Sequence, residues 1–229
     1  MEISLTGVDC AILLIALGFL SISAILSISE AALKWYDAKM GGKKTKGGIL
    51  SGAEILRQME KGNISITTFD KKRLNPNSVN VRLHPILLEY IIDDERPYVD
   101  MKRDNPVREI DLRDYPDGFI MEPGKFYLGS TVEYTETKHG IVPMLEGRSS
   151  NARLSLAIHV TAGFGDVGFS GKWTLEMFSI IPVKIYHGID IGQVYYLTLS
   201  GEELMNYKES GKYNGQDMPV ASKSYKDFE

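Results

Sequence analysis

The chain has 229 residues, of which 43% are hydrophobic and 24% are charged, so it can hold one globular domain with a sizeable core and a short additional segment. The net charge of −4 argues against a general nucleic-acid binder, because such proteins present a basic surface. Cys10 is the single cysteine, which excludes an intrachain disulfide and a cysteine-based zinc cluster. The four histidines show no metal-ligand spacing, so we expect no zinc site.

The first predicted element is a hydrophobic segment at residues 10–29, inside an N-terminal region of residues 1–40. It contains no charged residue and has about the 20-residue length that a helix needs to cross a bilayer. Lysines follow it, and the positive-inside rule then predicts that the rest of the chain is cytoplasmic. Two other interpretations stay open: a buried helix, or an extension upstream of a true start at Met40.

The main domain is predicted to comprise residues 49–229, after a basic glycine- and lysine-rich linker at residues 41–48. A short helix opens the domain, because Ser51 and Glu54 have the spacing of a capping box. Gly62 provides a typical stop for this helix.

After this helix, the hydrophobic pattern alternates in residues 64–66, 79–83 and 126–134, which predicts half-buried strands. Residues 97–116 are charged and irregular, and we expect a solvated loop region there. No long helical pattern follows. The predicted fold class is therefore mainly β, a barrel or jelly-roll-like body with a short N-terminal helix.

The most informative stretch is residues 147–176, GRSSNARLSLAIHVTAGFGDVGFSGKWTLE. Its arginines and serines suit a phosphate. Residues 154–161 alternate and predict a strand. A glycine-rich turn follows and holds Asp166, which either accepts a hydrogen bond from a sugar hydroxyl or stabilises its own loop as an Asx turn.

A second predicted strand, residues 173–178, contains an acid, Glu176. If Trp173, Leu175 and Met177 share one face, Glu176 lies on the other face between bulky neighbours. Partial burial would raise the pKa of its carboxyl group toward the range that suits a general base. From the pattern alone, a surface glutamate on an edge strand is the simpler interpretation.

Several motifs in the main domain resemble the pattern of one family. GRSSNAR is similar to its GRSSLAR or GRSSLGR, and HVTAGFGDVGFSGKWTLE is similar to its H-x-T-A-x-x-x-D-P-G-F/W-x-G-x-x-x-L-E. The LSGAEIL helix, the NPNSVNVRL strand and GKYNGQ near the C-terminus also match. On these motifs the chain resembles the dCTP deaminase family, a branch of the trimeric dUTPase superfamily.

The resemblance implies a dUTPase-like distorted β-barrel or jelly-roll, a homotrimer with sites between subunits, and zinc-independent hydrolysis of dCTP to dUTP and ammonia. Glu176 would be the general base, and Ser149 and Arg153 would position the water and the base. The implied substrate-binding residues are Arg148, Ser150, Lys212 and Gln216 for the triphosphate, with Tyr207 near it, Asp166 for the deoxyribose, and Ala162 and Thr174 for the pyrimidine.

The resemblance also implies Mg²⁺ held through the nucleotide triphosphate rather than by protein side chains, and dTTP as a feedback inhibitor. A bifunctional relative, which forms dUMP and pyrophosphate, stays open as the alternative, because the motifs are split between the two branches. A plain dUTPase is disfavoured, since such enzymes do not need the glutamate of the L-E motif. A non-catalytic, membrane-tethered nucleotide sensor also stays open.

Three residues depart from the family pattern. Val167 replaces the usual proline after Asp166, and Gly165 replaces a common isoleucine, so we expect a looser turn. Asn151 replaces an apolar residue in the GRSSNAR motif. None of these changes removes a proposed catalytic group.

Overall fold

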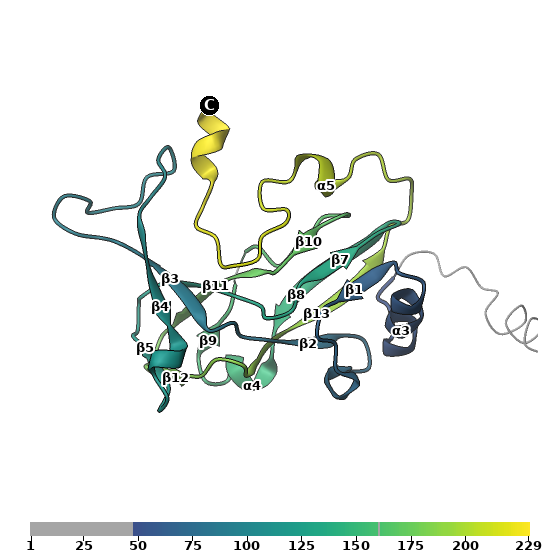
Figure 1. Ribbon diagram of the computed structural model, residues 1–229, viewed down its shortest axis with the longest axis horizontal. Coiled ribbons are helices and arrows are strands. Elements are labelled where there is room, and N and C mark those ends of the chain that lie inside the picture. Colours follow the sequence, from purple (N-terminus) through teal and green to yellow (C-terminus); the bar gives the residue numbers. More distant parts are fainter. Residues whose placement is uncertain (1–47, 160) are drawn as a thin grey trace, which may run out of the picture. The chain divides into compact units, whose positions relative to one another are not determined.

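The computed structural model describes residues 48–229 except residue 160 (Figure 1). The predicted segments at residues 1–40 and 41–47 lie outside this described part. Within the described part, no helix is both long and apolar enough to cross a membrane.

The described residues are mainly β, as the sequence predicts. Three short α-helices interrupt the strands, namely α3 (Gly52–Glu60), α4 (Ser149–Ala152) and α5 (Tyr207–Ser210). The 3₁₀ helices are η1 (Lys71–Arg73), η2 (Leu112–Asp114) and η3 (Ser224–Phe228). The strands are β1 (Ile64–Ile66), β2 (Val79–Arg82), β3 (Ile86–Tyr90), β4 (Val107–Asp111), β5 (Phe119–Met121), β6 (Tyr127–Ser130), β7 (Thr135–Thr137), β8 (Ile141–Gly147), β9 (Leu156–Ala157), β10 (Ser170–Gly171), β11 (Thr174–Ser179), β12 (Val183–Ile185) and β13 (Asp190–Thr198).

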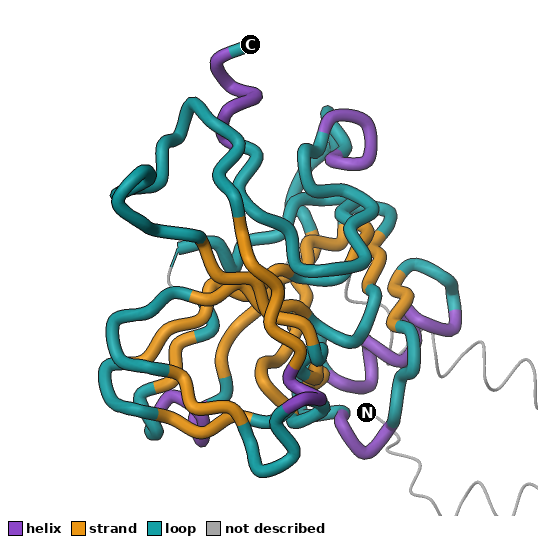
Figure 2. Tube along the Cα trace, turned by 60° about the vertical axis from the view of Figure 1, so that its left-hand side comes forward, coloured by secondary structure: helices purple, strands orange, loops and turns teal. Residues whose placement is uncertain are grey.

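These strands form four sheets with the orders β4-β3-β6-β11-β9, β2-β13-β8, β1-β7-β10 and β12-β5. Figure 2 shows the strands gathered together, with long loops extending around them. Within residues 48–229, outside the gap at 160, no sheet closes on itself, so the predicted barrel is wrong as a closed structure. The reason is that β9 and β10 are only two residues long, and that isolated bridges such as Leu83 to Thr131 replace continuous ladders.

The predicted helix is confirmed as α3. The Ser51 hydroxyl accepts a hydrogen bond from the Glu54 backbone N–H at 3.3 Å, which satisfies one of the free donors at the helix start. Ile55, a residue of this helix, is fully buried. Gly62 follows the end of the helix with φ 73°, a conformation that favours glycine.

The predicted strands at residues 64–66 and 79–83 are confirmed as β1 and β2. The loop predicted at residues 97–116 is wrong over its second half, where β4 pairs with β3. Charged residues obscured this strand because it is an exposed edge strand, and edge strands carry charges that discourage further pairing. Arg108 of β4 contacts Glu89 of β3 at 2.7 Å across the ladder.

The strand predicted at residues 154–161 is mostly wrong. Among the described residues of this range, which exclude 160, β9 is the only strand, and it pairs with the end of β11. Leu154 is 58% exposed, so it does not join a buried face. Ser155 has φ 67°, a left-handed conformation that separates α4 from β9.

Candidate active site

Several predicted site residues line one cavity of about 460 Å³. The walls come from β3, β6, β11, α5, the loop between β9 and β10, and the C-terminal segment. Figure 1 shows this last segment, in yellow, passing beside β11 and β10. The predicted residues that line the cavity are Ala162, Asp166, Thr174, Glu176, Tyr207 and Gln216.

Strand β11 directs its alternate side chains to two different environments. Trp173, just before the strand, is 5% exposed, and both Leu175 and Met177 are fully buried in the core. Because successive side chains of a strand point to opposite faces, Thr174 and Glu176 face away from this core and line the cavity. The face predicted for Glu176 is therefore confirmed, and Glu176 is not an edge-strand surface residue, because β11 lies between β6 and β9.

The Glu176 carboxyl group is half-buried in the cavity wall. Burial raises its pKa above the ordinary value of 4.5, and a hydrogen bond with its own backbone N–H opposes part of this rise. Its Oε2 atom is covered and has no hydrogen-bond partner among the described residues. A desolvated carboxyl group without an ion-pair partner suits proton transfer near neutral pH.

The Asp166 carboxylate lies at the exposed side of the same cavity. Its backbone carbonyl accepts a hydrogen bond from the Phe169 N–H at 3.1 Å, but its carboxylate makes no hydrogen bond to the residues that the structure describes. An Asx turn would use this carboxylate. The geometry therefore favours the other interpretation, in which the carboxylate is free to accept a bond from a ligand hydroxyl.

The loop that carries Asp166 packs more closely than the sequence suggests. A β-carbon at Gly165 would lie 2.4 Å from the Trp173 ring and 2.7 Å from the Pro143 carbonyl oxygen. The Gly165 backbone N–H also donates to that carbonyl at 3.0 Å. Gly165 thus permits a close approach to the core, and the looser turn predicted from this residue is wrong.

Tyrosines form much of the remaining wall, and only Tyr207 was predicted from the sequence. Its backbone N–H donates to the Val167 carbonyl at 2.8 Å, and its hydroxyl accepts from the Tyr213 N–H at 3.3 Å. Tyr213 and Tyr90 also line the cavity. The GKYNGQ motif includes Tyr213 and gave a signal for it, but no sequence pattern links the end of β3 to this site.

The Gln216 side chain lines the cavity but its amide nitrogen is already used. Nε2 donates to the Lys172 carbonyl oxygen at 2.5 Å, while Oε1 is buried without a partner among the described residues. Phosphate oxygens are acceptors. Contact with a triphosphate, as predicted, therefore requires this amide to turn away from Lys172.

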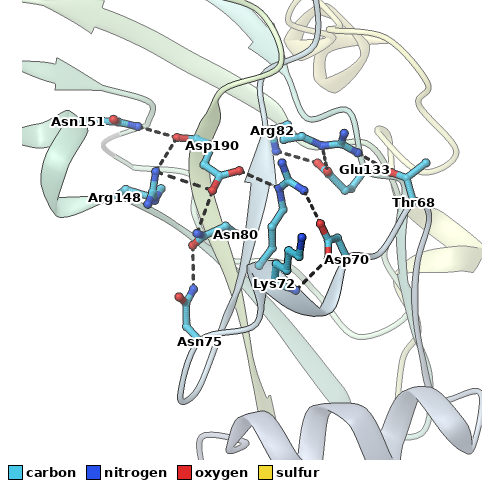
Figure 3. Close-up of polar contacts among 11 residues, drawn as sticks. Thr68, Asp70, Lys72, Asn75, Asn80, Arg82, Glu133, Arg148, Asn151 and Asp190 are labelled. Carbon is cyan, nitrogen blue, oxygen red and sulfur yellow. Dashed lines mark hydrogen bonds and ion pairs between the residues drawn. The ribbon is translucent and has the colours of Figure 1, made fainter.

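The GRSSNAR turn lies apart from this cavity. Figure 3 shows Arg148 and Asn151 turned toward β13, where Arg148 Nη1 and Asn151 Nδ2 each donate to the Asp190 carbonyl at 3.1 Å. Arg148 Nη1 also lies 4.0 Å from the Asp190 carboxylate. The other predicted residues of this turn are exposed and do not line the cavity, namely Ser149, Ser150 and Arg153.

Lys212 is also outside the cavity. Its ammonium group pairs with the Asp227 carboxylate of η3. A single chain therefore brings together Glu176, the residues predicted for the base and sugar, and two of those predicted for the triphosphate, Tyr207 and Gln216. The other residues predicted for the triphosphate and those predicted for the catalytic water lie outside the cavity of their own chain.

Comparisons with known proteins identify the family of the chain. The family model described as dCTP deaminase-like matches residues 49–199. A dUMP-forming dCTP deaminase of Clostridium beijerinckii is 51% identical over 181 residues, which cover 79% of this chain and 99% of that protein. The corresponding protein of Leptospira biflexa is 50% identical over 181 residues, which cover 79% of this chain and 98% of that protein.

A solved structure shares the fold. It is the 2′-deoxycytidine 5′-triphosphate deaminase of Agrobacterium tumefaciens, with a TM-score of 0.51 and 19% identity over 73% of this chain. The chain spans about half of that structure's length, 52%. The chain belongs to the dCTP deaminase-like family.

Proposed function

We propose that this protein is a dUMP-forming dCTP deaminase. The observation that carries the proposal is Glu176, a half-buried carboxyl group with a raised pKa in the wall of a cavity that also presents Thr174 and Asp166. The names of the relatives that are about half identical over nearly their whole length support dUMP as the product. The overall reaction consumes one dCTP and two waters, and releases ammonia, pyrophosphate and dUMP.

In the deamination step, the Glu176 carboxylate takes a proton from water while the water oxygen forms a bond to C4 of cytosine. Glu176 passes this proton to N3 of the ring, which gives a neutral tetrahedral centre at C4. Glu176 then takes the proton of the new C4 hydroxyl group and gives it to the amino group, so that the C4–N bond breaks, ammonia leaves and C4 becomes a carbonyl. Thr174, two residues before Glu176 on the same face of β11, would contact the pyrimidine, and Asp166 would accept a hydrogen bond from the sugar hydroxyl.

We further propose a homotrimer whose sites are completed by a neighbouring subunit. Ser149 and Arg153 are the residues predicted to position the water and the base, yet both are exposed and lie apart from the cavity of their own chain. A second copy would supply them together with Arg148 and Ser150. Cyclic assembly of this kind is common for soluble proteins and buries residues that are exposed in one subunit.

Mg²⁺ would bind through the substrate triphosphate. The described residues contain no group of three His, Cys, Asp or Glu side chains that would hold a metal ion. Mg²⁺ sites of this kind rely on substrate phosphates and water, and the ion neutralises phosphate charge. Inhibition by dTTP and a cytoplasmic location stay predictions.

The alternative is the dUTP-forming activity, since the motifs are split between the two branches. The two reactions are separated by incubating the full chain with dCTP and Mg²⁺ and following ammonia, dUTP, dUMP and pyrophosphate together. We expect ammonia, dUMP and pyrophosphate to rise in equal amounts. Accumulating dUTP would replace the proposal by the dUTP-forming alternative, and a lack of ammonia would leave the nucleotide sensor or the plain dUTPase.

A further inference from the structure

The C-terminal segment at residues 214–222 is tied along β10 and along the residues that lead from β10 into β11, the strand that carries Glu176. The Asn214 side chain accepts from the Ser170 N–H at 3.0 Å, and the Gly215 N–H donates to the Ser170 carbonyl at 2.6 Å. Four residues further on, the Thr174 hydroxyl accepts from the Val220 N–H at 3.3 Å. The segment is therefore bound at residues 170 and 174, on either side of Lys172 in the chain.

Lys172 makes the central contacts with this segment. Its backbone N–H donates to the Gln216 carbonyl at 2.9 Å, and its carbonyl accepts from Gln216 Nε2 at 2.5 Å. The approach is close, because a β-carbon at Gly171 would lie 3.2 Å from the Gln216 carbonyl oxygen. These bonds fix the residue pair in register.

An ion pair adds to these backbone contacts. Lys172 Nζ lies 2.9 Å from the Asp217 carboxylate, and the Lys172 side chain is only 14% exposed, whereas Asp217 is 75% exposed. The pair with Lys172 lowers the pKa of Asp217. Burial, and then the Lys172 charge, lower the pKa of His84, so this neighbouring imidazole is not a competing cation for Asp217 near neutral pH.

We propose that Lys172 is a positioning residue that, through its ion pair with Asp217, holds the C-terminal segment in the register where Gln216, Val220 and Ser222 close the cavity over Glu176. The functional part of this inference rests on the proposed deaminase activity. Without the pair, the segment keeps the packing of the buried Pro219 and hydrogen bonds that water can replace. The cavity then opens more often, and substrate is bound less tightly.

Charge reversal and charge exchange test this role in the full-length protein. In Asp217→Lys, two lysines face each other, and we expect kcat/KM for dCTP to fall about tenfold, mostly through a higher KM. Amide hydrogen exchange should become faster in residues 214–222. The exchanged pair Lys172→Asp/Asp217→Lys restores opposite charges, and should recover kcat/KM to within about threefold of the wild type.

Glu122→Lys is the matched control. Glu122 is also exposed and pairs with Lys125 at the same distance of 2.9 Å, in a turn outside the C-terminal segment. We expect this variant to behave like the wild type in both measurements. An Asp217→Lys protein with unchanged kcat/KM and unchanged exchange would overturn the inference, as would an exchanged pair that performs no better than Asp217→Lys.

These measurements also distinguish a failure of the positioning role from a failure of the proposed deaminase activity. A wild-type protein that releases no ammonia from dCTP refutes the deaminase activity, while the exchange measurement still decides whether the ion pair holds the segment. A deaminase whose segment exchanges equally in the wild type and in Asp217→Lys refutes the positioning role alone.

Discussion

The indole N–H of Trp173 donates to the hydroxyl of Thr135 at 2.9 Å inside the core. Both residues are almost fully buried, at 5% and 1% exposure. This bond joins the start of β11 to β7 and fixes which face of β11 is internal. The position of Glu176 three residues later follows from it, because side chains alternate along a strand.

Replacement of Trp173 by phenylalanine should therefore destabilise the fold. The variant leaves the buried Thr135 hydroxyl without its donor, and unpaired buried polar groups cost about 1–3 kcal/mol of the free energy of unfolding. Urea denaturation of Trp173→Phe measures this loss. The double variant Thr135→Val/Trp173→Phe has no unpaired hydroxyl, so Trp173→Phe should cost less unfolding free energy in the Thr135→Val background than in the wild type. If the losses of the two single variants simply add up in the double variant, the bond does not contribute as described.

Replacement of Glu176 by glutamine should remove deamination. Glutamine keeps the shape of the side chain but takes no proton, and loss of a general base costs about 100- to 10,000-fold in rate. Ammonia release from dCTP measures the effect, and binding of dCTP by calorimetry serves as the control for an intact cavity. Turnover within a few-fold of the wild type would show that Glu176 is not the base.

The raised pKa of Glu176 also predicts two pH effects. The base must be ionised, so kcat/KM should rise with pH through the raised pKa and then level off. The folded state also binds the Glu176 proton more tightly than the unfolded chain does. The stability that this proton contributes is therefore fully present below the ordinary pKa of 4.5, and it is lost as the pH rises through the raised pKa of the folded state.

Glu176→Gln removes this titration. Its melting temperature should therefore exceed that of the wild type at neutral pH, and the difference should shrink as the pH falls below 4.5. Scanning calorimetry of both proteins at neutral pH and at a pH below 4.5 measures these melting temperatures. A difference that grows toward acid would contradict the assigned sign.

The sequence predicted the parts of the site that depend on local pattern. The alternation of Trp173, Leu175 and Met177 correctly assigned the face of Glu176, because one side of β11 is apolar and the other is not. It failed for residues 154–161, where the same alternation occurs but Ser155 adopts a left-handed conformation. Hydrophobic alternation does not report such a local change in backbone direction.

Contacts between residues far apart in the chain could not be predicted from the sequence. The pairing of β3 with β4 was hidden by charges on an edge strand, and no sequence pattern indicated that Tyr90, at the end of β3, lines the cavity beside the C-terminal segment. Its hydroxyl accepts from the Ser222 N–H at 3.0 Å, across 132 residues of chain. The family motifs identified site residues, but not that Arg148 would turn toward Asp190 and away from the cavity.

A buried ion pair offers a separate test of the fold. Glu133 is 2% exposed and accepts from Arg82 at two points, the backbone N–H at 2.8 Å and Nε at 2.7 Å (Figure 3). Glu133→Ala leaves a partly buried guanidinium unpaired and should cost about 3–5 kcal/mol of unfolding free energy. Urea denaturation should show a smaller loss for Arg82→Met/Glu133→Ala, and an equal or larger loss would contradict the cost assigned to the isolated charge.

Shared sites predict complementation between inactive subunits. Glu176→Gln and Arg153→Ala should each be inactive as homotrimers, since one lacks the base and the other lacks the cation from the neighbouring subunit. Mixed trimers, refolded from equal amounts, should regain activity in about a quarter of their sites, because random assembly joins two intact contributions that often. If sedimentation shows that mixed trimers have formed and no activity returns, both residues belong to the site of the same subunit.

If water replaces the amino group at C4 of dCTP, the oxygen of that water ends in the uracil base, and labelling with ¹⁸O detects it. The full-length protein is incubated with dCTP and Mg²⁺ in H₂¹⁸O, and the dUMP formed is analysed by mass spectrometry of its uracil base. We expect one ¹⁸O atom in the uracil of the product, with ammonia released in equal amount. Pyrophosphate release with an unchanged cytosine, or dUMP without ¹⁸O in its base, would contradict the proposed deamination.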